Sequence, residues 1–344
     1  MIIDPKETLE SLLNGDDLDV VTMEALMGAI MDGELEHAQV AGILVALRAK
    51  GESGIEVAAA ARAMRDRALR VTAPAGAIDT CGTGGDGAET INISTASALV
   101  AAAGGVPVAK HGNRSVSSKC GSADVLEAIG VRLDLDREAI AELLDEVGIG
   151  FLFAQQLHPA MAAVVPIRKA LGVRTIFNLL GPLTNPAGVT RQILGVWGPD
   201  VQPLVAVALA ELGAEHAMVL HSEDGLDELS VMAPTTVIEV RDGIVAETWS
   251  LNPADLGIRV DDPESLRGGD VSENARRLCA ILEGREHSAA SEAVALNAAA
   301  ALLVGGKVDS LASGLEMARE LLDSGTAGRT LEALARRSRE LGDA

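Results

Sequence analysis

The sequence predicts an α/β protein in which a small all-helical N-terminal domain precedes a larger α/β domain with a mostly parallel central sheet. Residues 1–70 show helical periodicity and no strand signal, and strand-like and helix-like segments alternate beyond about residue 77. Strands that alternate with helices are typical of βαβ units. Hydrophobic residues make up 48% of the 344 positions and aromatic residues only 1%. Such a core consists largely of Ala, Leu, Val and Ile, and alanine favours helices.

The first 70 residues carry clear helix boundaries. Residues 36–50 have apolar residues at helical spacing and end at Gly51, which is typical of a helix terminus. Ser53 and Glu56 then form a capping-box pattern, so we expect a second helix to run to about residue 68. Proline and glycine in residues 71–76 predict a linker. We therefore expect domains at 1–70 and 75–344.

The larger domain is predicted from the alternating segments. Strands are expected at residues 77–80, 106–109, 149–154, 192–197 and 216–221. Helices are expected at residues 94–103, 122–129, 137–147 and 201–212, and again from about residue 271 to the end. Asp242-Gly243 predicts a hairpin between residues 235–240 and 244–249. The proline-rich stretch 159–186 interrupts this rhythm, and we expect it to leave the main domain.

The charge pattern predicts a local anion site on an acidic protein. The formal net charge of −22 disfavours binding to nucleic acids or to anionic membranes. No acidic residue lies between Glu146 and Asp200, where about eight are expected at the average frequency. Residues 106–123 form a second acid-free window. Burial of both windows would explain the missing acids but not the cations retained between Lys110 and Arg174, which are Lys110, Arg114, Lys119, Arg168, Lys169 and Arg174.

The remaining composition favours a reducing cytosol. The three cysteines, Cys81, Cys120 and Cys279, are odd in number and lack zinc-site spacing. The N-terminus resembles no signal peptide, and no run of 18 apolar residues could span a membrane. We therefore expect a cytoplasmic protein.

The first candidate loop, Asp79–Asp86, is rich in glycine and leads through Thr90–Thr95 into a predicted helix. Glycines allow successive N–H groups to turn inward around an anion, and a helix N-terminus adds further N–H groups and a positive dipole end. A plain glycine turn followed by a serine cap is the alternative. The loop matches neither G-x-G-x-x-G nor the Walker A pattern, so a dinucleotide or nucleoside triphosphate fold is not indicated.

The second candidate loop, Lys110–Ser122, also follows a predicted strand and precedes a helix. Its cations, amide and hydroxyls form a dense set of donors for phosphate and ribose oxygens. At the carboxyl end of a strand beside the first loop it would complete a cleft. His111 is either a hydrogen-bonded structural histidine or a member of the site.

Two further features suggest a metal ion and a carboxylate ligand. Asp227 and Glu228 are adjacent in a loop after a predicted strand, and magnesium prefers a few protein oxygens together with phosphates and water. A solvated acidic turn is the alternative. Arg168 lies in the acid-free window and could clamp a carboxylate with two parallel hydrogen bonds, or it is a helix-surface arginine.

Together these motifs resemble the anthranilate phosphoribosyltransferases, which catalyse the second step of tryptophan biosynthesis from chorismate. The resemblance is nearly full length, and its most specific part is Lys-His-Gly-Asn-Arg at 110–114 with the Ser-Ser-x-x-Gly-Ser-Ala-Asp-Val-Leu that follows. It implies a magnesium-dependent glycosyltransferase that moves the phosphoribosyl group of phosphoribosyl pyrophosphate (PRPP) to the amine of anthranilate. It also implies a hinge between the domains, a site between them, the return of part of 159–186 to the helical domain, and a homodimer formed through the helical domains.

The resemblance also implies roles for individual residues. The PRPP-binding residues would be Gly82, Gly85, Asp86, Thr90, Asn92, Ile93, Ser94, Thr95, Lys110, His111, Gly112, Asn113, Arg114, Ser115, Val116, Ser117, Ser118 and Ser122. Two Mg²⁺ ions per subunit would be served by Ser94, Asp227 and Glu228. Anthranilate would contact Gly82, Asn113 and Arg168. No residue is assigned as a general base.

The sequence departs from the family pattern near the acceptor residues. Gln155 stands where proline is usual, and Ala162 where lysine is common. Three other functions stay open. A pyrimidine nucleoside phosphorylase would share the architecture, a phosphoribosyltransferase for another aromatic acid would share the donor site, and a non-catalytic relative would bind nucleic acid.

Overall fold

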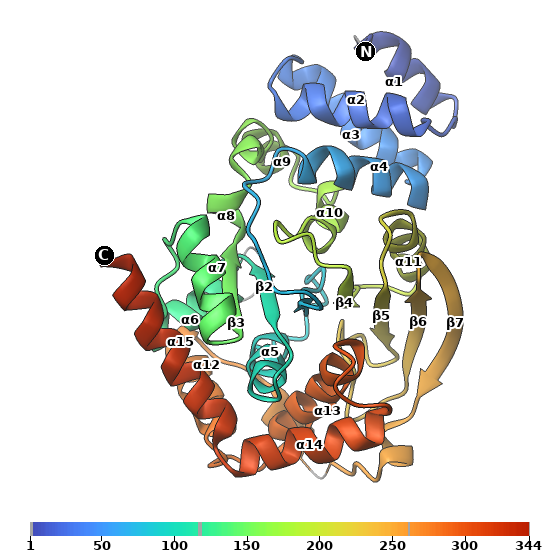
Figure 1. Ribbon diagram of the computed structural model, residues 1–344. Coiled ribbons are helices and arrows are strands. Elements are labelled where there is room, and N and C mark those ends of the chain that lie inside the picture. Colours follow the sequence, from blue (N-terminus) through green and yellow to red (C-terminus); the bar gives the residue numbers. More distant parts are fainter. Residues whose placement is uncertain (1–2, 116–118, 261, 344) are drawn as a thin grey trace.

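The computed structural model describes residues 3–115, 119–260 and 262–343. Four helices form the N-terminal part (Figure 1), and they are α1 (Pro5–Leu13), α2 (Val20–Met31), α3 (His37–Lys50) and α4 (Gly54–Arg65). The predicted capping box is present, since Ser53 Oγ accepts from the Glu56 N–H and Glu56 Oε2 accepts from the Ser53 N–H. The expected helical character of the N-terminal part is confirmed.

Helix α4 ends at Arg65, three residues before the predicted end. The N–H groups of Arg67 and Ala68 still make turn bonds to Met64 O and Arg65 O, and contacts with distant residues then take over. The Arg67 guanidinium donates to both carboxylate oxygens of Asp32 at the end of α2. The Leu69 N–H donates to Leu157 O at 2.9 Å. These distant partners lie outside any local sequence pattern.

The central sheet has seven strands in the order β3-β2-β1-β4-β5-β6-β7. The first five in this order run parallel, whereas β5, β6 and β7 pair antiparallel. The predicted hairpin turn is confirmed, since Asp242 and Gly243 both have positive φ, as a type I′ turn requires. The strands are β1 (Ile78–Asp79), β2 (Val108–Gly112), β3 (Ile149–Phe153), β4 (Arg191–Gly195), β5 (His216–Ser222), β6 (Thr235–Arg241) and β7 (Ile244–Leu251).

Strand β2 differs from the prediction of 106–109, because it begins at Val108 and continues through the polar residues Lys110 and His111 to Gly112. It pairs with β3 over its whole length, and both polar side chains are buried. A hydrophobic pattern cannot detect a strand that buries lysine and histidine.

Helices cover both faces of the sheet. Each face of the sheet has its own hydrophobic core. Successive side chains of β4 point to opposite faces, so Ile193 belongs to one core and Leu194 to the other. Alanine-rich α13 is almost wholly buried and packs against α5 and α14. The helices of this domain are α5 (Ile93–Ala103), α6 (Ser122–Ile129), α7 (Arg137–Glu146), α11 (Gln202–Glu211), α12 (Val271–Leu282), α13 (Ala289–Val304), α14 (Leu311–Asp323) and α15 (Thr326–Gly342), with 3-10 turns η2 (Pro253–Leu256) and η3 (Pro263–Leu266).

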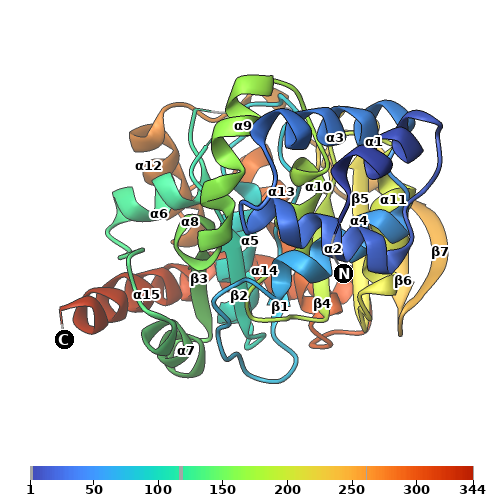
Figure 2. The same cartoon turned by 90° about the horizontal axis from the view of Figure 1, so that it is seen from above.

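The proline-rich stretch 159–186 leaves the sheet. It follows the short helix α8 (Ala154–Leu157) and forms η1 (Pro159–Ala163), α9 (Val165–Leu171) and α10 (Phe177–Leu183). The turn η1 packs against α2, α9 against α3, and α10 against α4, and Figure 2 shows α9 beside α3 from above. Side chains of α9 and α10 share one hydrophobic core with α2, α3 and α4. The domain boundaries themselves stay a prediction.

Within the residues that the structure describes, no helix is both long enough and apolar enough to cross a membrane.

Candidate functional site

The carboxyl ends of β1, β4 and β5 bring the first loop together with the acidic pair. The Thr83 N–H donates to Gly195 O at 2.9 Å, at the end of β4. The Gly84 N–H donates to Asp227 Oδ2 at 2.9 Å, and the Ser94 N–H at the start of α5 donates to Glu228 Oε1 at 3.1 Å. Loops after parallel strands meet at one sheet edge, which is where open α/β sheets bind ligands.

Gly195 is a residue of this edge that the sequence reasoning missed. A Cβ atom added to Gly195 would lie 1.4 Å from Asp227 O, so only glycine allows the acidic loop to cross β4 here. The available signal was a glycine at the end of an apolar strand, which often marks a close backbone approach.

Glycine gives the first loop a backbone that few other residues could adopt. Gly84, Gly85 and Gly87 have φ values of 63°, 80° and 75°, a region that glycine adopts without strain. Ile93 and Thr95, at the start of α5, have buried side chains, and the Ile93 N–H already donates to Ile91 O at 2.8 Å. The loop can therefore present N–H groups to an anion.

Asp227 and Glu228 lie in a cluster of like charges. Burial raises the pKa of Asp227 to about 7, and the nearby Asp86 carboxylate contributes to this rise. Burial likewise raises the pKa of Glu228 well above its usual value, with added repulsion from Asp227 and Asp86. Three crowded carboxylates that are costly to ionise together are suited to a divalent cation, which would relieve their repulsion. The residues present thus fit a magnesium ion, which Asp227 and Glu228 would hold.

A buried polar network fixes the start of the second loop. Asp79 Oδ1 accepts from the His111 N–H at 3.2 Å, and Asp79 Oδ2 accepts from Asn185 Nδ2 at 2.8 Å. Asn185 Nδ2 also donates to Ala109 O, and Lys110 Nζ donates to Thr80 O at 3.2 Å. Burial raises the pKa of Asp79 to about 6, while the charge of Lys110 opposes this shift. The sequence reasoning missed Asn185.

The described part of the second loop is held by the helix that follows it. Arg114 forms ion pairs with Asp124 and Glu127 of α6, at 3.0 and 2.7 Å. Ser122 Oγ donates to Asn113 O at 3.3 Å. Val116, Ser117 and Ser118, which the sequence also predicts as PRPP-binding residues, lie outside the described residues.

One departure from the family pattern directly affects a residue that is predicted to contact anthranilate. Gln155 Nε2 donates to Asn113 Oδ1 at 3.1 Å, so the glutamine that replaces the usual proline engages the amide predicted to contact anthranilate. Gly82, the other predicted acceptor contact in the first loop, lies beside Asp227, since a Cβ at Gly82 would be 3.1 Å from Asp227 Oδ2.

Arg168 of α9 is a partly buried cation that pairs with no carboxylate in the described parts of the chain. Its guanidinium lies 5.6 Å from the centre of the Phe177 ring, and burial lowers its pKa. A desolvated guanidinium of this kind gains strongly from a carboxylate ligand. Nearby, Arg174 Nη2 donates to Gly85 O at 2.8 Å and stacks on Trp197, so the segment after α9 reaches the first loop.

His111 and His158 form a buried neutral pair. His111 Nδ1 lies 3.1 Å from Gly181 O, and the two Nε2 atoms are 3.3 Å apart. A carbonyl only accepts hydrogen bonds, so His111 carries its proton on Nδ1 and accepts from the His158 Nε2–H. Burial lowers the pKa of His111 to about 3 and that of His158 to about 4. The structure gives His111 a structural role in addition to its predicted place in the site.

This pair predicts acid-sensitive stability. Both histidines stay neutral in the folded chain, whereas in the unfolded chain they take up protons below about pH 6.5. The free energy of unfolding should therefore fall as the pH drops from about 7 to about 5.5, by about 1 kcal/mol for each histidine. His158→Gln should remove the part of this pH dependence that comes from His158. Urea unfolding of both chains at the two pH values measures this, and an unchanged pH dependence in His158→Gln would contradict it.

Asp79, Cys81 and His111 place potential metal ligands within 4.8 Å of one another. Both Asp79 oxygens and both His111 ring nitrogens already make hydrogen bonds. This cluster is therefore better explained as part of the hydrogen-bond network than as a metal centre.

Comparison with known proteins identifies the family. Residues 74–328 match the model of the glycosyl transferase family a/b domain, and residues 6–68 match that of its helical bundle domain. The anthranilate phosphoribosyltransferase of Symbiobacterium thermophilum is 49% identical over 331 residues, which are 96% of this chain and 96% of that protein. The chain belongs to the anthranilate phosphoribosyltransferase family.

Solved members of the family share the whole fold. The anthranilate phosphoribosyltransferase of Thermus thermophilus superposes with a TM-score of 0.91 at 45% identity, over 96% of this chain and 99% of that one. The Saccharomyces cerevisiae enzyme, solved in complex with PRPP and Mg, gives a TM-score of 0.90 at 27% identity over 98% of both chains. Family membership confirms the predicted fold class, a helical N-terminal part and a large α/β domain.

Proposed function

We propose that this chain transfers the phosphoribosyl group of PRPP to the amine of anthranilate, giving N-(5-phosphoribosyl)anthranilate and pyrophosphate. The observation that carries the proposal is the contact of the first loop and the α5 N-terminus with Asp227 and Glu228. It joins N–H groups suited to phosphate with carboxylates suited to magnesium. Relatives of nearly full length bear the same activity in their names, and the yeast enzyme binds PRPP with Mg and, separately, 4-fluoroanthranilate.

The residues of the chain would act mainly on the leaving group. Breaking the bond between ribose C1 and oxygen builds negative charge on the departing pyrophosphate. The N–H groups of the first loop and of the α5 N-terminus would stabilise this charge, because they are fixed before the reaction begins. Mg²⁺, when bound at Asp227 and Glu228, would neutralise part of the same charge.

The acceptor needs orientation more than activation. An aromatic amine is a weak base and is uncharged near pH 7, so its lone pair is available without a general base. Arg168 would hold the anthranilate carboxylate and direct the amine at C1. Closure of the loops over both substrates would exclude water, which would otherwise hydrolyse the donor.

An anthranilate fluorescence assay tests this function directly. Adding PRPP should abolish the fluorescence only when Mg²⁺ is present, with release of one pyrophosphate for each anthranilate consumed. Phosphate-dependent cleavage of a pyrimidine nucleoside instead would identify a nucleoside phosphorylase. Binding of PRPP in calorimetry without loss of anthranilate would point to another aromatic acid as the acceptor.

We further propose two Mg²⁺ ions per subunit, a cytoplasmic location and a homodimer formed through the helical domains. The dimer is supported by large apolar side chains that α1, α2 and α3 expose, namely Leu13 (65%), Val21 (58%) and Val45 (45%). Large apolar side chains exposed on the helical part are available to a protein interface. Sedimentation equilibrium of the full chain would measure the subunit number.

A further inference from the structure

The first and second candidate loops are predicted to bind the phosphoribosyl donor and are called the donor loops below. They contact each other close to the helices that follow them. Asn92, immediately before α5, donates from Nδ2 to Cys120 O at 3.1 Å, just before α6. Glu89 forms an ion pair with Lys119 at 3.0 Å. Glu89 also has a positive φ of 51°, which is rare for a residue other than glycine. The spacing of the two loops therefore depends on the segment from Glu89 to Asn92.

Asn274 of α12 fixes the orientation of the Asn92 amide. Only 2% of Asn274 is exposed. Its Oδ1 accepts from the Gly269 N–H at 2.7 Å, and its Nδ2 donates to Asn92 Oδ1 at 3.2 Å. Because the Gly269 N–H can only donate, it determines which end of the Asn274 amide faces Asn92. Asn92 must then turn its own Nδ2 toward the carbonyl of Cys120.

The turn at Gly268 and Gly269 is itself clamped against the first loop. The Gly268 N–H donates to Glu89 O at 2.8 Å, and the Ile91 N–H donates to Leu266 O at 3.0 Å. A Cβ atom added to Gly268 would lie 2.6 Å from Thr90 O, so the two backbones meet closely.

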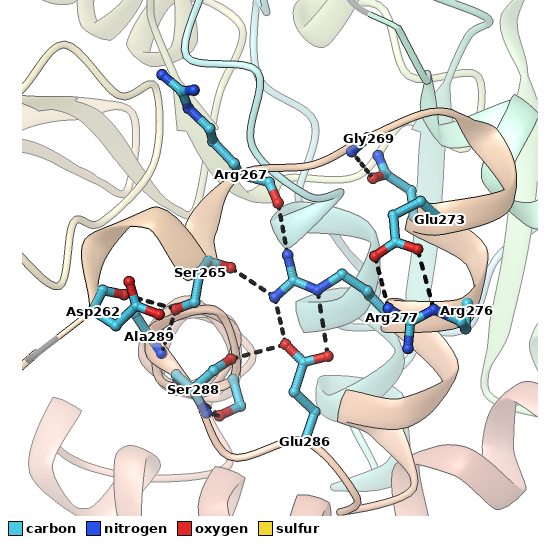
Figure 3. A network of polar contacts seen from close by, with 12 residues as sticks. Asp262, Ser265, Arg267, Gly269, Glu273, Arg276, Arg277, Glu286, Ser288 and Ala289 are labelled. Carbon is cyan, nitrogen blue, oxygen red and sulfur yellow. Dashed lines mark hydrogen bonds and ion pairs between the residues drawn. The ribbon is translucent and has the colours of Figure 1, made fainter.

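Arg277, one helical turn beyond Asn274, supports the residues just before this turn (Figure 3). Its guanidinium donates to Ser265 O and Arg267 O, both at 2.6 Å, and pairs with Glu286. The neighbouring Arg276 contacts only Glu273 among the side chains drawn and is largely exposed. The helix thus carries one arginine that supports the turn and one that does not.

We propose that Asn274 is a positioning residue for the phosphoribosyl donor, which sets the spacing of the two donor loops through Asn92. The inference rests on the proposed function, since it takes these loops as the PRPP site. In an Asn274 variant the loops would lose a fixed spacing, and donor binding would have to order them. The affinity for PRPP should therefore decrease, whereas the affinity for anthranilate should change little.

Two Asn274 variants and a matched control test this role in the full chain. Asn274→Ala removes both hydrogen bonds. Asn274→Asp keeps the shape and the acceptor for the Gly269 N–H but cannot donate to Asn92. Both variants lose the hydrogen bond to Asn92. Each should therefore raise the KM for PRPP and its calorimetric Kd with Mg²⁺ about tenfold, as expected for the loss of that one buried bond. The KM for anthranilate at saturating PRPP should change less than about twofold, and Arg276→Ala should leave all three constants unchanged.

Other results would overturn the inference in distinguishable ways. Equal increases in both KM values, or a lower melting temperature with an unchanged Kd for PRPP, would reduce Asn274 to a stabilising residue. If Asn274→Ala does not fold, the isosteric Asn274→Asp variant decides the question alone. A wild-type chain that binds PRPP but leaves anthranilate intact would overturn the proposed acceptor and leave the Kd comparison valid. A wild-type chain that binds no PRPP would overturn both proposals.

Discussion

Replacing Asp227 by Asn and Glu228 by Gln together is expected to lower kcat/KM for PRPP by about a thousandfold or more, which corresponds to about 4 kcal/mol of transition-state stabilisation. The amides keep the shape of the carboxylates but carry no charge for a metal ion. Their oxygens can still accept from the Gly84 and Ser94 N–H groups. The fluorescence assay across a magnesium titration measures the loss.

The same double variant should fold at least as well as the parent chain. Burial and mutual repulsion raise the pKa of both carboxyls, so their neutral replacements remove an unfavourable interaction. The melting temperature should therefore stay constant or rise. Glu223→Gln is the control, because this exposed carboxylate lies in the same acidic loop. Magnesium-dependent activity within about tenfold of the parent would rule out the metal assignment.

Arg168→Ala is expected to raise the KM for anthranilate about 50-fold and the KM for PRPP much less. Loss of a charged, bidentate hydrogen bond costs about 1.5–3 kcal/mol, and each 1.4 kcal/mol is a factor of ten. Stability should change little, since Arg168 forms no ion pair within the described residues and contributes chiefly its contact with Phe177. Initial rates with each substrate varied in turn separate the two constants.

Two further variants sharpen this test. Lys169→Ala, at the exposed neighbouring position of α9, should leave both constants unchanged. Arg168→Lys keeps the charge but loses the planar fork, so its KM for anthranilate should lie between those of the parent and the alanine variant. An equal rise in both KM values would refute a specific contact between Arg168 and the acceptor carboxylate.

Local patterns in the sequence were sufficient for most elements of this fold. The capping box at Ser53 and Glu56, the hairpin at Asp242-Gly243 and helix α6 all form as predicted, because each depends on neighbouring residues. Strand β2 was misplaced because its second half buries Lys110 and His111, whose partners come from the end of β1, α10 and the residue before η1.

For the candidate site, the loops could be predicted from the sequence, but the residues that hold the loops in place could not. The glycines and acids that suggested an anion and a metal ion stand in short motifs. Asn185 and Asn274 instead act on residues that lie more than a hundred positions earlier, so nothing local marks them. The pairing of Arg114 with Asp124 and Glu127 spans only 10 and 13 positions, but it joins a loop to the following helix, which a pattern within one element does not show.

The contacts of Gly84 with Asp227 and of Ser94 with Glu228 have a thermodynamic consequence for ligand affinity. The two N–H groups already donate to carboxyl oxygens that belong to the chain. If pyrophosphate oxygens take over these donors, one set of hydrogen bonds replaces another, and only their difference contributes to affinity. The acidic pair thus acts as an intramolecular competitor for the anion site. A cation that draws the carboxylates away would relieve that competition, so metal and donor should each strengthen the binding of the other.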